Sequence, residues 1–198
     1  MTTKHSPMAA ISPKRCAASL SGPADERVFM SILALNGSSR ADGETARLLN
    51  AVLRPLDDVA QFDLGALRIG PYSYDHANAD DDFLPLARAM LKARVIVLAS
   101  PVYWYSMSAQ MKAFFDRLTD LTDAPYKPLG KQLAGKTMFA VATGSRDAPP
   151  LSFEEPFSGT ARYFNMRWGG MLYRAGRDAL SAEDIAAARE FTELVAGA

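Results

Sequence analysis

The sequence predicts an α/β fold in which a doubly wound, five-stranded parallel sheet, in the order 2-1-3-4-5, has helices on both faces. Two near-continuous apolar runs, Val28–Leu35 and Val95–Ala99, are typical of strands that are buried on both faces. Segments with apolar residues at helical spacing separate the strand-like runs, and short turn-rich connections join them. Strands and helices that alternate in this way indicate parallel strands joined by helical crossovers.

Five strands and five helices are expected in alternation along the chain. The expected strands span 28–35, 59–64, 95–99, 137–143 and 168–173. The expected helices span about 44–53, 83–91, 107–118 and 154–165, and a last one begins near Ala182. Between residues 121 and 133 the sequence predicts only a polar, proline-containing connection.

Three consecutive aspartates, Asp80–Asp82, precede the second expected helix. An acidic cluster of this kind can be functional. It is explained more simply as the N-terminus of the helix, where carboxylates cap free N–H groups and meet the positive end of the helix dipole. We therefore assign these residues a structural role.

The first residues differ in composition from the rest of the chain. Ser, Pro, Ala, Lys and Arg dominate residues 1–26, and no acidic residue precedes Asp25. This composition predicts a disordered N-terminal extension, followed by one domain over residues 27–198. A transit peptide is the alternative, whereas the apolar core of a secretion signal is missing from this stretch. We expect a cytoplasmic location.

Charge and composition exclude several classes of partner and site. The 22 basic and 22 acidic residues balance, which argues against nucleic acid or an anionic membrane surface as the main partner. The sequence contains no run of eighteen apolar residues, so no membrane span is predicted. The single cysteine, Cys16, and the two histidines, His5 and His76, are scattered, so no metal site is expected and both histidines are interpreted as surface residues.

The loop after the third expected strand carries the most specific pattern in the chain. Ser100 and Pro101 form a turn, and Tyr103, Trp104 and Tyr105 follow as three consecutive aromatic residues ahead of a helix. In an open parallel sheet, ligands bind beyond the carboxyl ends of the strands. The rings could therefore contact a flat aromatic ligand, or they could simply pack the loop against the domain.

Two further loops are expected at the same edge of the sheet. After the first strand, residues 37–45 offer glycines, hydroxyls, Arg40 and a helix N-terminus, which are the components of a phosphate cradle, although an ordinary turn and helix cap would look similar. Residues 143–146, after the fourth strand, supply a hydroxyl and backbone N–H groups. A phosphate site, a ring platform and a donor loop together favour a phosphorylated aromatic cofactor. For this to hold, Ser38, Trp104 and Gly144 must border a common crevice.

These segments resemble the flavodoxin-fold NAD(P)H-dependent FMN oxidoreductases, including the multimeric flavodoxin-like members. Residues 37–49 resemble the phosphate loop of that family, residues 100–118 its second FMN loop and helix, and residues 143–145 its third loop. The resemblance extends over about residues 28–175. The chain departs from the family pattern at Ser39, where proline is usual, and at Glu44, where asparagine is usual. Because a carboxylate would repel a phosphate, we expect Glu44 to point away and to offer only its backbone N–H.

The resemblance implies bound FMN, reduction by NADH or NADPH, and transfer to a quinone, a flavin or a similar small-molecule electron acceptor. It implies three sets of cofactor-binding residues: Ser38, Ser39, Arg40 and Thr45 for the phosphate; Pro101, Val102, Tyr103 and Trp104 for the isoalloxazine; Thr143, Gly144 and Ser145 for its pyrimidine side. Because hydride chemistry belongs to the flavin, no catalytic side chain is assigned. A homodimer or higher homo-oligomer is also implied.

Three alternatives share parts of this pattern. A non-enzymatic electron carrier of the flavodoxin type is usually strongly acidic, whereas this chain is neutral. A signalling receiver domain needs a phosphorylatable aspartate after the third strand, where this chain has Ser100 and Pro101. A cysteine-ligated iron–sulfur flavoprotein needs more than the one cysteine present. A substrate pocket bordered by Tyr72, Tyr74, Tyr105 and Arg146 is a further hypothesis, with ordinary surface loops as its simpler alternative.

Overall fold

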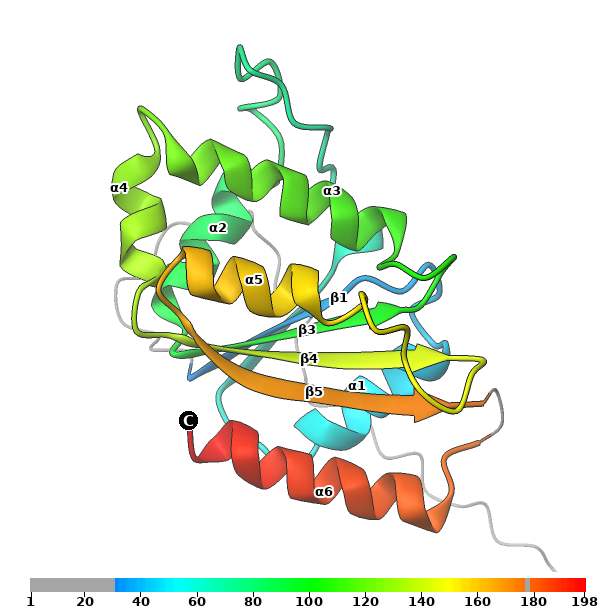
Figure 1. Cartoon of the computed structure of the whole chain (residues 1–198). Coiled ribbons are helices and arrows are strands. Elements are labelled where there is room, and N and C mark those ends of the chain that lie inside the picture. Colours follow the sequence, from blue (N-terminus) through cyan, green and yellow to red (C-terminus); the bar gives the residue numbers. More distant parts are fainter. Residues whose placement is uncertain (1–30, 177–178) are drawn as a thin grey trace, which may run out of the picture.

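Five parallel strands form one sheet in the order β2-β1-β3-β4-β5 (Figure 1). The computed structural model describes residues 31–176 and 179–198. The strands are β1 (Ile32–Asn36), β2 (Val59–Asp63), β3 (Val95–Pro101), β4 (Thr137–Gly144) and β5 (Arg167–Ala175). The predicted fold class and strand order are therefore confirmed. Residues 28–30 of the first expected strand, together with the predicted N-terminal extension, lie outside the described residues.

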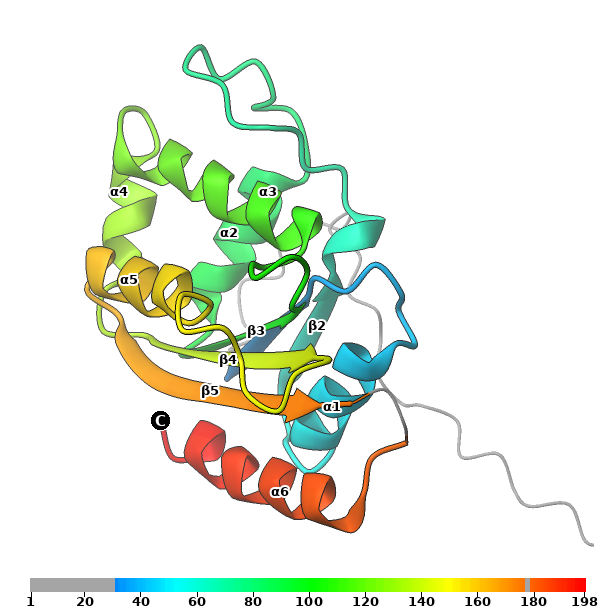
Figure 2. The ribbon, with the colours of Figure 1, turned by 45° about the vertical axis from the view of Figure 1, so that its right-hand side comes forward.

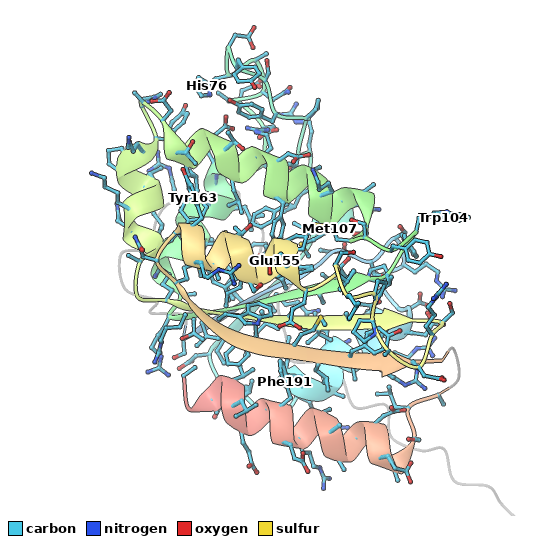
Figure 3. The ribbon with its side chains drawn as sticks, in the orientation of Figure 1. His76, Trp104, Met107, Glu155, Tyr163 and Phe191 are labelled. Carbon is cyan, nitrogen blue, oxygen red and sulfur yellow. The ribbon has the colours of Figure 1, made fainter. Side chains whose placement is uncertain are left out.

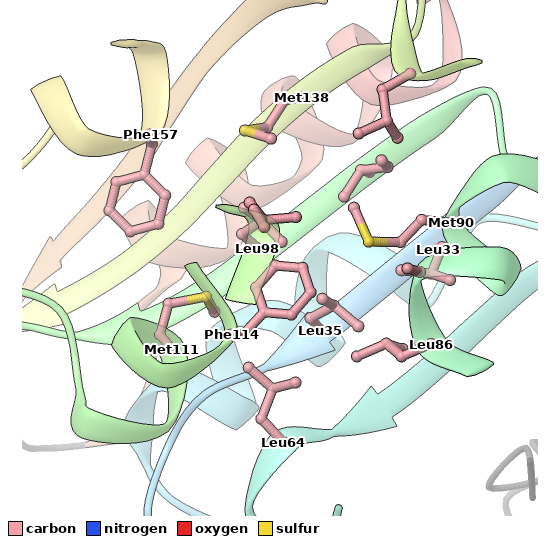
Figure 4. Close-up of a cluster of buried hydrophobic side chains, with 14 of the residues drawn as sticks. Leu33, Leu35, Leu64, Leu86, Met90, Leu98, Met111, Phe114, Met138 and Phe157 are labelled. Atoms are coloured by element: carbon pink, nitrogen blue, oxygen red, sulfur yellow. The ribbon is translucent and has the colours of Figure 1, made fainter. Parts of the chain in front are cut away.

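Helices cover both faces of the sheet, as Figures 1 and 2 show from two directions. One face carries α2 (Phe83–Lys92), α3 (Ala109–Arg117) and α5 (Glu155–Tyr163), and the other carries α1 (Glu44–Leu53) and α6 (Ala182–Ala196). Each face has its own apolar cluster, because successive residues of a strand point to opposite sides. The larger cluster places Leu33, Leu35 and Leu98 of the strands against α2, α3 and α5 (Figure 4).

The stretch between α3 and β4 differs from the expected plain connection. It contains a 3₁₀ turn (Leu118–Thr122), the short helix α4 (Lys127–Gly130) and a second 3₁₀ turn (Lys131–Leu133). Leu121 and Leu133 at its two ends are buried in the larger apolar cluster. Elements of three to five residues are too short to show a hydrophobic period, so the sequence pattern could not predict them.

The segment between the 3₁₀ turn at Leu64–Ala66 and α2 projects beyond α3 (Figures 1 and 2). We call residues 67–82 the arm. Its base is held by Arg117, whose side chain is almost fully buried and pairs with the carboxylates of Asp81 and Asp120. Arg117 also donates to the backbone oxygens of Gly70 (3.3 Å) and Asn78 (3.1 Å). Burial opposes a charged guanidinium, but the two carboxylates outweigh it and raise the pKa of Arg117.

The aspartates before α2 are structural, as expected, although they act differently from simple caps. Asp81 accepts hydrogen bonds from the backbone N–H groups of Phe83 (2.9 Å) and Gly70 (2.8 Å), as well as from Arg117. Asp82 is the N-cap residue by position, yet its carboxylate accepts from the N–H of Arg68 rather than from the helix. The cluster therefore fixes the arm to the domain.

His76 lies on the arm with 29% of its side chain exposed, but its ring also has defined partners. Its ring is half-buried, Nδ1 lies 3.0 Å from a carboxylate oxygen of Asp120, and the ring packs edge-on against Tyr126. His76 thus belongs to the group that anchors the arm. Its partner is 44 positions away in the sequence, which is why the local pattern gave no sign of it. The other histidine, His5, lies outside the described residues.

Candidate functional site

The carboxyl ends of β1, β3 and β4 bring the three expected loops to one edge of the sheet. Asn36 at the end of β1 pairs with Ala99 in β3, and Pro101 at the end of β3 pairs with Thr143 in β4. Val102 continues this contact beyond the sheet, because its N–H donates to the carbonyl of Thr143 (2.8 Å). The edge is therefore one continuous surface built from segments far apart in the sequence.

A crevice with a volume of about 230 Å³ opens at this edge, and we call it the main crevice. Nine of the eleven predicted cofactor residues line it, together with Glu44 and Gly176, which were not predicted. The lining residues are Ser38, Arg40, Glu44, Thr45, Pro101, Val102, Tyr103, Thr143, Gly144, Ser145 and Gly176. Ser39 and Trp104 are the two predicted residues that do not line it.

The loop after β1 is held in one conformation by its own polar groups. Asn36 accepts from the N–H of Ser38 (3.1 Å), and the Ser38 hydroxyl accepts from the N–H of Arg40 (3.2 Å). Gly37 lies tightly against α3: a Cβ here would come within 3.0 Å of Met111 Cε and 3.1 Å of the Ala99 carbonyl oxygen. Only glycine fits this close approach comfortably. Ser38 is consequently buried in the wall of the main crevice.

The N-terminus of α1 faces the same crevice. Its N-cap residue is Gly43, which has no side chain to cap the first N–H groups of the helix. Uncapped N–H groups at the positive end of a helix dipole form a ready anion site. Ser38 and Arg40, in the loop before this helix, line the same crevice. This donor set has the chemistry that a phosphate group requires.

The carboxylate of Glu44 forms an ion pair with Arg40 at the edge of the main crevice. One carboxylate oxygen lies 2.9 Å from Nη2 of Arg40. A hydrogen bond with its own backbone N–H, followed by the interaction with Arg40, lowers the pKa of Glu44. The carboxylate thus accepts a hydrogen bond from one nitrogen of the Arg40 guanidinium. An i,i+4 ion pair was readable from the spacing of Arg40 and Glu44.

Two buried hydroxyls join the first and third loops. The side-chain oxygens of Thr45 and Thr143 are 2.6 Å apart. Since Thr45 lies in the first turn of α1 and Thr143 near the end of β4, this hydrogen bond ties the helix N-terminus to the sheet edge. Both predicted residues lie in the wall of the main crevice, with their hydroxyls committed to each other.

The aromatic loop forms a tight two-residue turn. Tyr103 and Ser106 exchange backbone N–H···O hydrogen bonds of 2.9 and 3.0 Å, and the two residues between them have φ angles of 49° (Trp104) and 68° (Tyr105). Positive φ angles at both central positions are normally supplied by Asn-Gly, because a bulky side chain is strained there. Trp104 is 93% exposed and lies at the carboxyl edge of the sheet (Figure 3).

A second crevice, of about 170 Å³, adjoins the first. Its lining residues are Val102, Trp104, Tyr105, Gly144, Ser145, Arg146, Pro150 and Tyr173. Val102, Gly144 and Ser145 line both crevices. We expected Ser38, Trp104 and Gly144 to border one common crevice. Instead, Ser38 borders the main crevice and Trp104 the second crevice, and Gly144 lies in the wall that the two share. Tyr105 and Arg146, predicted as candidate pocket residues, line this crevice; Tyr72 and Tyr74 pack edge-on against each other on the arm.

Tyr173, at the carboxyl end of β5, is the main site residue that the sequence analysis missed. Its hydroxyl donates to the carbonyl of Arg146 (2.7 Å), and burial raises its pKa. A Cβ on Gly144 would lie only 2.6 Å from the Tyr173 hydroxyl oxygen. The residues of the edge strand β5 are mostly half-buried and give little sequence signal about the loops they support, so only the position of Tyr173 near a strand end could have indicated this role.

The described residues fit FMN. Ser38, Arg40 and the uncapped end of α1 suit a phosphate, while Pro101, Val102 and Tyr103 offer an apolar surface to a flat ring. Within residues 31–176 and 179–198, no cluster of His, Cys, Asp and Glu could hold a metal ion. In the same part of the chain, no helix has both the length and the hydropathy needed to cross a membrane.

Comparisons with known proteins identify the family of this chain. The model of the NADPH-dependent FMN reductase family matches residues 30–156. A curated relative named as an NAD(P)H-dependent FMN-containing oxidoreductase, YwqN of Bacillus subtilis, is 27% identical over 129 residues, which is 62% of this chain and 70% of the relative.

Solved structures give the same picture of the fold. The Trp repressor binding protein of Bacillus subtilis superposes with a TM-score of 0.65 at 20% identity, covering 82% of this chain and 96% of that one. An NADPH-quinone reductase from P. pentosaceus gives a TM-score of 0.59 at 16% identity, covering 81% and 96%. Because the family model spans well over half of its residues, this chain belongs to the NADPH-dependent FMN reductase family of oxidoreductases, with FMN as cofactor and NAD(P)H as co-substrate.

Proposed function

We propose that this protein passes reducing equivalents from NADH or NADPH, through bound FMN, to a quinone, a flavin or a similar small acceptor. The observation that carries the proposal is the main crevice, in which nine residues predicted from three separate loops lie together at the carboxyl edge of the sheet. Quinone as an acceptor is suggested by the name of a structural neighbour, the reductase from P. pentosaceus. The cytoplasmic location and the homodimer expected from the sequence stay predictions.

Within the crevice, we assign the phosphate to Ser38, Arg40 and the first N–H groups of α1. An anion at this place would compete with Glu44 for the guanidinium of Arg40. Thr45 holds the helix N-terminus in place through its hydrogen bond to Thr143 rather than through a direct role. The loop after β1 keeps Ser38 fixed before any ligand arrives, because Asn36 and the N–H of Arg40 already hold it. Less ordering is then needed on binding.

We assign the ring system to Pro101, Val102 and Tyr103, with backbone N–H groups near Gly144 and Ser145 on its polar side. FMN, when bound, supplies hydride acceptance and one- or two-electron transfer. The chain's own part would be placement and electrostatics: backbone N–H groups at Gly144 and Ser145, which line the main crevice, would stabilise negative charge on a ring bound there. No side chain in the crevice is required to act as a nucleophile or as a general acid.

A binding and turnover experiment tests the proposal. The full chain should bind one FMN, measured by the loss of free FMN fluorescence, and should then oxidise NADH or NADPH under anaerobic conditions with transfer of two electrons to added menadione. A chain that takes up no FMN would contradict the proposal. Binding of FMN without nicotinamide oxidation would instead indicate the electron-carrier alternative.

A further inference from the structure

The second crevice holds an arginine, Arg146, that forms no ion pair within 4.0 Å among the described residues. Arg146 is exposed. Its guanidinium carbon lies 5.1 Å from the centre of the Tyr105 ring, and Nη2 donates to the Tyr105 hydroxyl (3.1 Å). Stacking on a ring orients the cation without cancelling its charge.

Both sides of the Arg146–Tyr105 pair are fixed by backbone contacts. The carbonyl of Arg146 accepts from the Tyr173 hydroxyl (2.7 Å), and Tyr105 lies in the two-residue turn closed by Tyr103 and Ser106. That turn places Trp104 and Tyr105 in left-handed conformations, which cost stability for residues of this size. Strain of this kind is concentrated at ligand-binding positions, and here it presents two aromatic rings to the second crevice.

The two crevices are chemically distinct but share a wall. The main crevice has its anion donors in the loop after β1, and the second has an aromatic rim and a single cation. Val102, Gly144 and Ser145 contribute to both. A planar ligand seated against Trp104 and Tyr105 would therefore have an edge at the boundary of the main crevice, where we assign the flavin ring.

We propose that the second crevice binds the electron acceptor, and that Arg146 selects planar aromatic acceptors that carry a negatively charged group, such as a sulfonate or a carboxylate. This inference rests on the proposed function. The overall reaction for a quinone is balanced: NAD(P)H, H⁺ and quinone give NAD(P)⁺ and hydroquinone. NADPH also combines aromatic rings with an anionic group, and its extra phosphate distinguishes it from NADH. The test therefore separates binding of the electron acceptor from binding of the NADPH phosphate.

The kinetic test compares matched acceptors and matched nucleotides on the FMN-loaded full chain. Arg146→Gln should lower kcat/KM for 1,4-naphthoquinone-2-sulfonate about fivefold, while kcat/KM for the uncharged menadione stays within about twofold and the NADPH/NADH ratio is unchanged. Arg146→Lys should keep part of the preference for the sulfonate. Arg162→Gln, which removes an exposed arginine on α5, is the control and should alter none of these values.

A binding measurement checks the crevice without turnover. In the full-length Trp168→Phe chain, Trp104 is the one remaining tryptophan, so quenching of its fluorescence reports ligands at the aromatic rim. Without FMN, 4-nitrobenzenesulfonate should quench at lower concentration than 4-nitrobenzyl alcohol, and Arg146→Gln should remove this difference. Circular dichroism verifies that each variant is folded.

Three results would overturn the inference. If Arg146→Gln lowered kcat/KM equally for charged and uncharged acceptors, Arg146 would only support the loop. A change confined to the NADPH/NADH ratio would mean that the crevice takes the nucleotide phosphate. Equal quenching by the two nitro compounds would show that Arg146 does not recognise the anion. Failure of the proposed function would look different, since no acceptor would be reduced while the quenching difference could still be measured.

Discussion

The carboxylate of Glu44 lies 2.9 Å from Nη2 of Arg40, inside the loop where the phosphate of FMN is assigned. The ion pair places a negative side chain on the donors that the phosphate needs. At the proposed phosphate site we therefore expect Glu44 to compete with the phosphate for Arg40, and a single substitution can remove this competitor.

Replacing Glu44 should strengthen FMN binding. Glu44→Gln removes a like charge a few ångströms from the assigned phosphate and releases Arg40, so we expect the Kd for FMN to fall about fivefold to tenfold at low ionic strength. Titration of FMN fluorescence at two salt concentrations measures this. Glu183→Gln, which changes an exposed acid in the first turn of α6, is the control. Equal or weaker FMN binding by Glu44→Gln would show that the carboxylate does not compete.

Neighbouring serines should differ sharply in their effect on FMN binding. Ser38 is buried in the crevice wall, whereas Ser39 is exposed, does not line the crevice and accepts a hydrogen bond from Gln110. We expect Ser38→Ala to weaken FMN binding about tenfold, because a charge-assisted hydrogen bond is lost, and Ser39→Ala to change it less than twofold. If both variants lose affinity equally, the loop must rearrange when FMN binds.

Relaxing the aromatic turn should stabilise the protein. Asn and Gly at positions 104 and 105 suit two consecutive positive φ angles, so Trp104→Asn with Tyr105→Gly removes strain of about 1 kcal/mol per residue, less the loss of the Tyr105–Arg146 contact. We expect Tm to rise by about 2–4 °C, measured by differential scanning calorimetry. Trp104→Ala, which keeps a side chain at the strained position, should give no such rise. A lower Tm for the double variant would show that the rings stabilise the fold.

The arm should depend on the buried ion pairs of Arg117. Asp81→Asn leaves Arg117 with one carboxylate in a buried site, and removal of a buried partner costs about 3 kcal/mol of unfolding free energy. Urea denaturation measures the loss. Asp80→Asn changes the adjacent exposed aspartate and should stay within about 0.5 kcal/mol of the parent protein. A small effect of Asp81→Asn would mean that Asp120 alone is sufficient to hold Arg117.

The sheet and the crevice were predictable because both follow from local patterns. The apolar run Val95–Ala99 reads as a buried strand, and parallel topology places every loop at a strand's carboxyl end on the same edge. Residues from the three loops could therefore be assigned to one site before any distance between them was known. Ion pairs at i,i+4 spacing are local in the same way, and Lys112 and Asp116 on α3 form one at 2.6 Å.

What the sequence did not reveal depends on distant partners or on side-chain direction. Arg117 meets Asp81 across 36 positions, and no local pattern indicates that an arginine near a helix end is buried. The expectation for Glu44 considered only its charge and did not include its ion pair with Arg40. Tyr173 reaches the site from the edge strand, whose half-exposed pattern gives no hint of it.

The shared wall at Gly144 has a consequence for altering this protein by design. A Cβ at this position would come within 2.6 Å of the Tyr173 hydroxyl oxygen, so any larger residue here requires Tyr173 to move. Trp104, Tyr105 and Arg146 border the second crevice and not the main crevice. A library of variants restricted to those three positions should change which oxidants the protein accepts, while the residues that line the main crevice stay the same.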